Sequence, residues 1–142
     1  MKMTQEQMNE HLNGKYESKI WATIMANNDV LMEYALKYGA SAGSVGALTN
    51  EYCYIGLIED RLDVVVLNNF SSKKEYEFSI NLNDITKIKI KKSIIPNRRV
   101  LILYLNNNKE IKISIMNNAK GTNIKNQKEN VNLLIEKLKK IR

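Results

Sequence analysis

Six short strand-like segments followed by one amphipathic helix fill residues 51–142, and this order constrains the fold more than any other feature. Polar or turn-forming stretches separate the segments, which span residues 51–58, 62–67, 75–80, 86–92, 100–105 and 110–116. Apolar and polar residues alternate in several of them, which is typical of strands with one buried face. The order predicts a mainly β (α+β) fold: a bent antiparallel sheet or barrel of six to seven strands, capped by the C-terminal helix.

Alternation also predicts which face of each strand is buried. In the segment 51–58 both alternating sets are largely apolar, so we expect this strand to be covered on both faces. In the segment 86–92, Ile88 and Ile90 are expected to point inward, while lysines at positions 87, 89 and 91 point outward. Residues 81–84 are expected to form a corner.

An apolar stripe at helical spacing predicts the C-terminal helix, and its members are Val131, Leu134, Ile135, Leu138 and Ile141. Asn126 precedes Glu129 by three residues, which predicts a cap pair at the start of this helix. Basic residues near the end suit the helix dipole.

The first fifty residues are less regular. Residues 4–7 have the spacing of a helix cap, which predicts a short helix over about 5–13. Residues 17–25 fit both a helix and a strand, and their Trp, Ile and Thr content favours the strand. A second helix is expected over 29–38. The small-residue stretch 39–46 lacks the Gly-Lys-Ser/Thr ending of a phosphate-binding loop, so it is expected to be a connection.

A chain of 142 residues matches a single domain. Residues 1–50 are expected to form a helical extension of that domain, with a first strand if 17–25 is extended, and residues 51–142 the β core and C-terminal helix. Cys53 is the only cysteine, so no intramolecular disulfide can form. The sequence has no apolar stretch typical of a signal peptide or a membrane span, so a cytoplasmic location is expected. Abundant Lys, Asn and Ile indicate the coding bias of an AT-rich genome.

The net charge of +7 is unevenly distributed along the chain. Residues 1–84 carry seven Lys/Arg and twelve Asp/Glu, a net charge of −5, whereas residues 85–142 carry fifteen and three, a net charge of +12. A basic half attracts anionic partners such as lipid headgroups, nucleic acid or an acidic protein surface. Solubility together with Lys-rich coding is the alternative explanation.

Candidate catalytic groups are few. Cys53 and His11 are the only residues of their types, and nothing in the sequence brings them together. One cysteine and one histidine cannot make a Cys/His-rich zinc site. Glu59, Asp60 and Asp63 would cluster at a turn, where a solvated hairpin tip is the simpler interpretation than acid–base chemistry. We therefore expect no enzyme activity, no cofactor and no metal.

Three stretches carry a resemblance to a known family: residues 54–62 (YIGLIEDRL), the corner 80–85 (INLNDI) and the loop-to-helix segment 121–127 (GTNIKNQ). They are similar to small bacterial domains of the pleckstrin-homology-like (PH-like, GRAM-like) family. The resemblance covers residues 51–142 and would take the strand at 17–25 as a seventh, with the helix at 29–38 as an insertion. It implies a binding or oligomerisation module rather than an enzyme, and it transfers no ligand residues.

Cations cluster in the fourth segment and the loop after it. The candidate anion- or partner-binding residues are Lys87, Lys89, Lys91, Lys92, Arg98 and Arg99. If the fourth and fifth segments pair as a hairpin, these cations gather near one edge, where charge and hydrogen bonds would hold phosphate groups. A solvated strand whose lysines protect a sheet edge from aggregation is the alternative.

These observations favour protein–protein contact with self-association as the first function hypothesis. Peripheral binding of anionic lipid is the second, and it would be stronger if residues 94–96 formed an exposed apolar tip rather than a packed loop. Nucleic-acid binding is less favoured because few aromatic residues lie among the cations. A phage or mobile-element accessory protein that binds a host factor is a further alternative.

Overall fold

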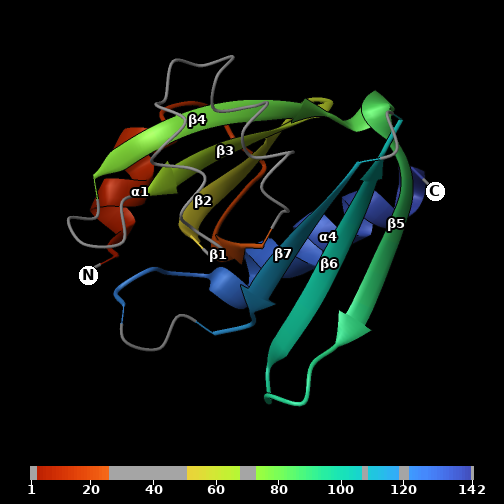
Figure 1. Cartoon of the computed structure of the whole chain (residues 1–142). Coiled ribbons are helices and arrows are strands. Elements are labelled where there is room, and N and C mark those ends of the chain that lie inside the picture. Colours follow the sequence, from red (N-terminus) through yellow and green to blue (C-terminus); the bar gives the residue numbers. More distant parts are fainter. Residues whose placement is uncertain (1–2, 26–50, 68–72, 107–108, 119–121, 142) are drawn as a thin grey trace.

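The computed structural model describes residues 3–25, 51–67, 73–106, 109–118 and 122–141. Its elements, labelled in Figure 1, are α1 (Gln5–His11), β1 (Ser18–Ile24), β2 (Glu51–Ile58), β3 (Arg61–Leu67), β4 (Lys74–Asn81), β5 (Ile85–Lys92), β6 (Arg98–Leu105), β7 (Glu110–Met116) and α4 (Gln127–Ile141). All six expected strand segments are confirmed to within two residues. The expected helix at 29–38 and the loop at 39–46 lie outside the described residues.

The seven strands form one antiparallel sheet in the order β4-β3-β2-β1-β7-β6-β5. β4 and β5 are consecutive in the chain, but they lie at opposite edges, and no ladder joins them within the described residues. The expected corner is a short 3-10 helix (Leu82–Asp84), whose first turn is capped by the Asn81 side chain. From this corner β4 and β5 run in different directions (Figure 1). The bent sheet is therefore confirmed, and the barrel alternative is wrong.

Residues 17–25 are extended, as the β-favouring side chains predict. β1 pairs with β2 along its whole length, from Ser18 opposite Leu57 to Ile24 opposite Glu51. On its other side it pairs with β7 only at Thr23 and Ile24. β1 thus joins the two halves of the sheet at one end and leaves them free to diverge at the other.

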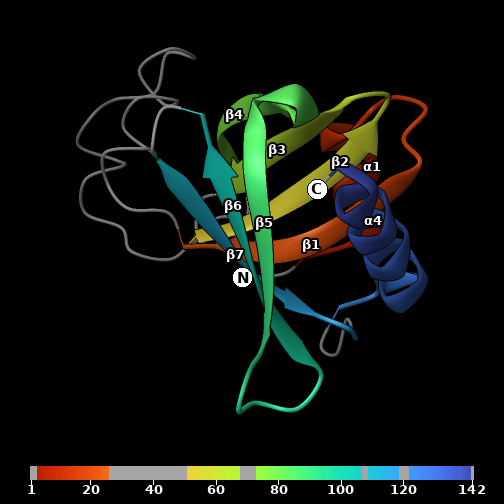
Figure 2. The ribbon, with the colours of Figure 1, turned by 90° about the vertical axis from the view of Figure 1, so that its right-hand side faces the viewer.

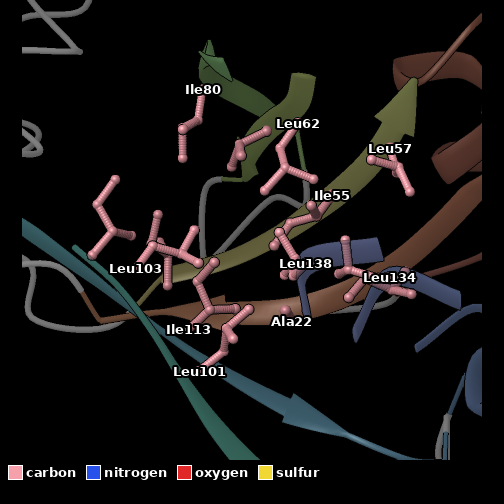
Figure 3. Packing of buried hydrophobic residues seen from close by; sticks show 14 of the residues in the cluster. Ala22, Ile55, Leu57, Leu62, Ile80, Leu101, Leu103, Ile113, Leu134 and Leu138 are labelled. Atoms are coloured by element: carbon pink, nitrogen blue, oxygen red, sulfur yellow. The ribbon is translucent and has the colours of Figure 1, made fainter. Parts of the chain in front are cut away.

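The main core fills the inside of the bend, and α4 covers one end of it (Figure 2). The predicted stripe is confirmed, because Val131, Leu134, Ile135 and Leu138 are all buried in the cluster to which the inward residues of the strands belong. Figure 3 shows Leu134 and Leu138 with Ala22 of β1 and Ile55 of β2 in this cluster. No helix of the described residues combines the length and apolar character needed to cross a bilayer.

A second, smaller cluster covers the opposite face of β2 and β3. Met8 and Leu12, from α1 and the residue after it, pack with Tyr54, Val65 and Leu67. The prediction that β2 is covered on both faces is therefore confirmed. The Thr4 hydroxyl accepts a hydrogen bond from the Gln7 N–H at 3.0 Å, as the cap spacing predicts. The helix ends at His11, earlier than expected.

Gln127, the first residue of α4, connects the helix to the sheet where β1 and β7 separate. Its side chain is buried, its Nε2 donates to the carbonyl oxygens of Trp21 and Met116 at 3.0 Å each, and its Oε1 accepts the Trp21 N–H at 3.2 Å. The amide thus takes the place of the strand partner that Trp21 lacks on this side. Asn126 lies at the N-cap position, since its carbonyl accepts the Asn130 N–H at 3.0 Å, but its φ of 60° differs from the extended backbone usual at an N-cap.

Candidate functional site

The β5–β6 hairpin extends beyond the rest of the sheet, and its tip is the outermost part of the molecule on that side (Figures 1 and 2). Residues 93–97 form the tip. The backbone N–H of Ser93 donates to the Arg98 carbonyl at 3.2 Å, and the Arg98 N–H donates to the Ile95 carbonyl at 3.3 Å. Asn97 closes the turn with a φ of 64°, a conformation that asparagine tolerates better than most residues.

The tip is apolar and exposed. Ile94 is 102% exposed, Ile95 is 48% exposed and Pro96 is also exposed, whereas the apolar residues of β5 and β6 are buried or half-buried. The alternative in which residues 94–96 form a packed loop is therefore wrong. The two isoleucines at the end of the projecting hairpin are accessible to another apolar surface.

The six candidate cations lie on a paired hairpin, but they divide between its two faces. Lys87, Lys89 and Lys91 are exposed on the outer face of β5, opposite Tyr104, Ile102 and Val100 of β6. The Lys87 ammonium lies 5.7 Å from the centre of the Tyr104 ring, within cation–π range. These three lysines form a row that leads toward the tip.

Lys92 and Arg99 lie on the other face. They are direct partners across the ladder, and alternation places them on the side that carries Ile90 and Leu101 further into the core. Arg98 alternates to the outer face, where its Nε donates to the Ser114 hydroxyl at 2.6 Å, although it also borders the cavity that Lys92 and Arg99 line. The structure thus brings Lys92 and Arg99 together, and it separates them from the outer lysines.

A cavity of about 220 Å³ lies behind the tip, and residues of four segments line it. Lys92 comes from the end of β5, Ser93, Ile95, Pro96 and Asn97 from the tip, Arg98 and Arg99 from the start of β6, and Asn117 from the residue after β7. The Asn117 N–H donates to the Asn97 carbonyl at 2.7 Å, which ties the end of β7 to the tip. Sequence reasoning did not identify Asn97 or Asn117, because only the β6–β7 register places them beside the cations.

A larger cavity of about 280 Å³ lies between the N-terminal segment and β4, and Asp63 is its central polar group. The Asp63 carboxylate accepts hydrogen bonds from Tyr16 at 2.7 Å, Ser79 at 2.7 Å and Arg61 at 2.9 Å. Burial alone would raise the pKa of this carboxyl, but the hydrogen bonds from Ser79, Arg61 and Tyr16 outweigh it and hold the pKa below its ordinary value. Burial and the bond to Asp63 raise the pKa of Tyr16 to about 12.

Asp63 therefore has a structural role, which replacement of its carboxylate by a neutral amide tests. Asp63→Asn should lower the free energy of unfolding by about 1 kcal/mol at neutral pH, because charge-assisted hydrogen bonds are lost. A lowered folded-state pKa contributes stability above the ordinary pKa of 3.8, and this contribution is lost as pH falls from 3.8 through the lower folded-state pKa. Urea unfolding should show the difference in unfolding free energy between the two proteins narrowing from pH 7 to pH 3.

Asp60→Asn makes the same chemical change at an exposed position of the neighbouring turn. It should change the free energy of unfolding by less than about 0.5 kcal/mol at either pH. If Asp63→Asn were destabilised by the same amount at low pH as at pH 7, an ionised Asp63 carboxylate would not be the source of the stability.

The remaining catalytic candidates are not assembled. Cys53 points into the main core, and burial raises the pKa of its thiol, which makes it a poor nucleophile. His11 lies on the opposite side of β2, where its ring stacks on Tyr54 with a centroid separation of 6.2 Å. Burial lowers the pKa of the His11 imidazole. Within the described residues no cluster of His, Cys, Asp and Glu could hold a metal ion.

No protein-family model matches the sequence, and no curated protein matches it. Among solved structures, the fold is similar to the C-terminal domain of an unknown protein from Leishmania infantum, with 11% identity, a TM-score of 0.48, and coverage of 94% of this chain and 93% of that chain. It is also similar to the pleckstrin homology (PH) domain of USP37, with 14% identity, a TM-score of 0.48, and coverage of 89% and 100%. Such low values give no basis for transferring a ligand or partner to this chain.

Proposed function

We propose that the chain is a non-catalytic binding module of the PH-like kind and that its β5–β6 hairpin binds the surface of an anionic membrane. Seven antiparallel strands followed by one amphipathic helix support the first part, because this is the element order on which the family resemblance depends. The exposed Ile94 at the end of a cationic hairpin is the observation that supports the second part.

Two weak forces combine at such a tip. Burying one isoleucine side chain contributes about 1.5–3 kcal/mol, and each Lys or Arg near an anionic surface contributes about 1 kcal/mol. Neither force alone gives stable attachment, but an apolar anchor together with a basic patch does. The hairpin carries both, since Ile94 and Ile95 are followed within a few residues on either side by cations.

The arrangement also limits the depth of insertion. Lys91 and Lys92 on one strand and Arg99 on the other lie directly behind the tip, at the level where lipid headgroups would surround an inserted Ile94. The two isoleucines would enter the region just below the headgroups, and the sheet would stay in water. In a cytoplasmic protein the surface it meets would be the inner leaflet, which is the anionic one.

Vesicle co-sedimentation tests this proposal. The protein should bind vesicles of phosphatidylcholine mixed with phosphatidylserine at low salt, and binding should weaken at high salt because the charges are screened. Ile94→Ser/Ile95→Ser should weaken binding by at least about tenfold, since apolar contact with the bilayer is lost.

Leu133→Ser is the matched control. Leu133 is 50% exposed on α4, away from the hairpin, so this variant loses an exposed apolar side chain without changing the tip. It should bind vesicles like the wild type. Equal binding by the wild type and the tip variant would refute membrane attachment through the tip.

Protein–protein contact with self-association is the second candidate function. The open sheet favours it, because β4 and β5 each have one edge without a neighbouring strand among the described residues. Such edges can pair with another chain, although the lysines of β5 oppose pairing between two copies of that strand. Sedimentation velocity without vesicles measures it directly. A mass that rises with protein concentration would support self-association, and a constant monomer mass would exclude it.

A further inference from the structure

We propose that Lys92 and Arg99 hold the phosphate group of a single lipid headgroup in the cavity behind the hairpin tip. This inference depends on the proposed membrane binding, and it adds a chemical preference to it. The outer lysines would supply general attraction to any anionic surface. The inner pair would recognise a phosphomonoester, the headgroup of phosphatidic acid and related lipids.

The cation pair is made of close neighbours. Lys92 and Arg99 face each other across an antiparallel ladder, where β-carbons lie about 4.5–5.5 Å apart. Like charges in this position repel each other and destabilise the hairpin. Neither residue forms an ion pair with a carboxylate of the described residues. An anion placed between them would remove this repulsion.

The cavity around the pair is lined by cations and neutral polar groups. Among the described residues no acidic side chain lines it, Arg98 adds a third cation whose Nε donates to the Ser114 hydroxyl, and Ser93, Asn97 and Asn117 add neutral polar groups. The Ser93 hydroxyl oxygen accepts the Ile95 N–H at 3.2 Å, which leaves the hydroxyl hydrogen directed elsewhere. A phosphate group is a strong acceptor with several oxygen atoms, so it can accept from the cations and the Ser93 hydroxyl together.

The chemistry of the two cations indicates the kind of phosphate. A guanidinium binds two phosphate oxygens in a fork, and an ammonium adds a point charge from another direction. A phosphomonoester carries about −1.5 to −2 charges at neutral pH and matches two cations. Phosphatidylserine presents a diester phosphate with one charge, which neutralises only one of them.

The position of the cavity identifies the source of the phosphate. Ile95 lines the cavity and also belongs to the exposed tip. When Ile94 and Ile95 enter the bilayer, the cavity would lie at headgroup depth, beside the molecules it would select. A lipid phosphate is therefore held by two contacts that act together, the inserted tip and the cation pair.

The experiment compares two kinds of vesicle with matched surface potential, one containing phosphatidic acid and the other phosphatidylserine. The wild type should bind the phosphatidic acid vesicles about tenfold more tightly. Lys92→Gln/Arg99→Gln should bind both kinds equally. Lys89→Gln/Lys91→Gln removes the same charge from the outer face. This variant should bind both kinds of vesicle more weakly and keep the preference for phosphatidic acid.

The outcomes separate this inference from the proposed function. No binding of the wild type to either vesicle would refute both. Equal binding of the wild type to both vesicles, or a preference that survives Lys92→Gln/Arg99→Gln, would refute the phosphate site and leave membrane binding standing. A last experiment titrates inorganic phosphate into the protein without vesicles. If free phosphate shifts the NMR signals of Lys92 and Arg99 at concentrations as low as those of vesicle phosphatidic acid, the claim that the bound phosphate belongs to a lipid is refuted.

Discussion

Gln127→Glu should lower the free energy of unfolding by about 3 kcal/mol or more. The present amide satisfies the N–H and the carbonyl of Trp21 and the carbonyl of Met116 in a buried position. A carboxylate would place an oxygen atom against these two carbonyl oxygens. Each buried polar group left without a partner costs about 1–3 kcal/mol, and a buried charge costs more.

The control for this prediction is Asn132→Asp, which changes an amide into an acid at an exposed position of the same helix. Guanidinium unfolding followed by circular dichroism should give a change below about 0.5 kcal/mol for the control. A Gln127→Glu variant as stable as the control would show that the amide does not hold β1, β7 and α4 together.

Gly56→Ala should lower the free energy of unfolding by about 2 kcal/mol, although replacing a strand glycine usually raises stability by about 0.5–1 kcal/mol. An added β-carbon would lie 2.6 Å from the Tyr16 Cδ1 and 3.2 Å from the Leu12 Cδ1. Tyr16 would have to leave its place over β2 and lose its bond to Asp63.

A double-mutant cycle checks this cause. Gly56→Ala made in a Tyr16→Ala background should be neutral or stabilising, because the clashing ring is gone. The two substitutions should therefore couple by about 2 kcal/mol in thermal or urea unfolding. Equal effects of Gly56→Ala in both backgrounds would contradict the close packing of Tyr16 on Gly56.

Local patterns predicted the strands and the C-terminal helix well because each depends on its own residues. The alternation in residues 86–92 and the stripe in residues 127–141 are visible in any short window of the sequence. The choice between a barrel and an open sheet depends on how far the corner at Leu82–Asp84 turns the chain, which no local pattern records. The structural role of Gln127 was missed for the same reason, since its hydrogen-bond partners Trp21 and Met116 lie on two strands that only the folded sheet brings to the helix.

The candidate site was predicted in part. The period-2 spacing of Lys87, Lys89 and Lys91 correctly placed them on one face, and the same alternation assigns Lys92 to the other face. The pairing of Lys92 with Arg99 depends on the length of the loop between them. The hydrogen bond of Arg98 depends on Ser114 of β7, which the local pattern does not reveal. Exposure of Ile94 was one of two alternatives that only the packed structure could separate.

The depth of residue 94 in a bilayer tests membrane binding most directly. Ile94→Cys offers a single site for an environment-sensitive fluorophore, because Cys53, the only native cysteine, is fully buried. Asn132→Cys, exposed on α4, provides the control position. With anionic vesicles at low salt, the label at position 94 should shift to shorter emission wavelengths and become shielded from an aqueous quencher, while the label at position 132 stays unchanged. A label at position 94 that remains accessible to the quencher on vesicle-bound protein would contradict insertion of the hairpin tip.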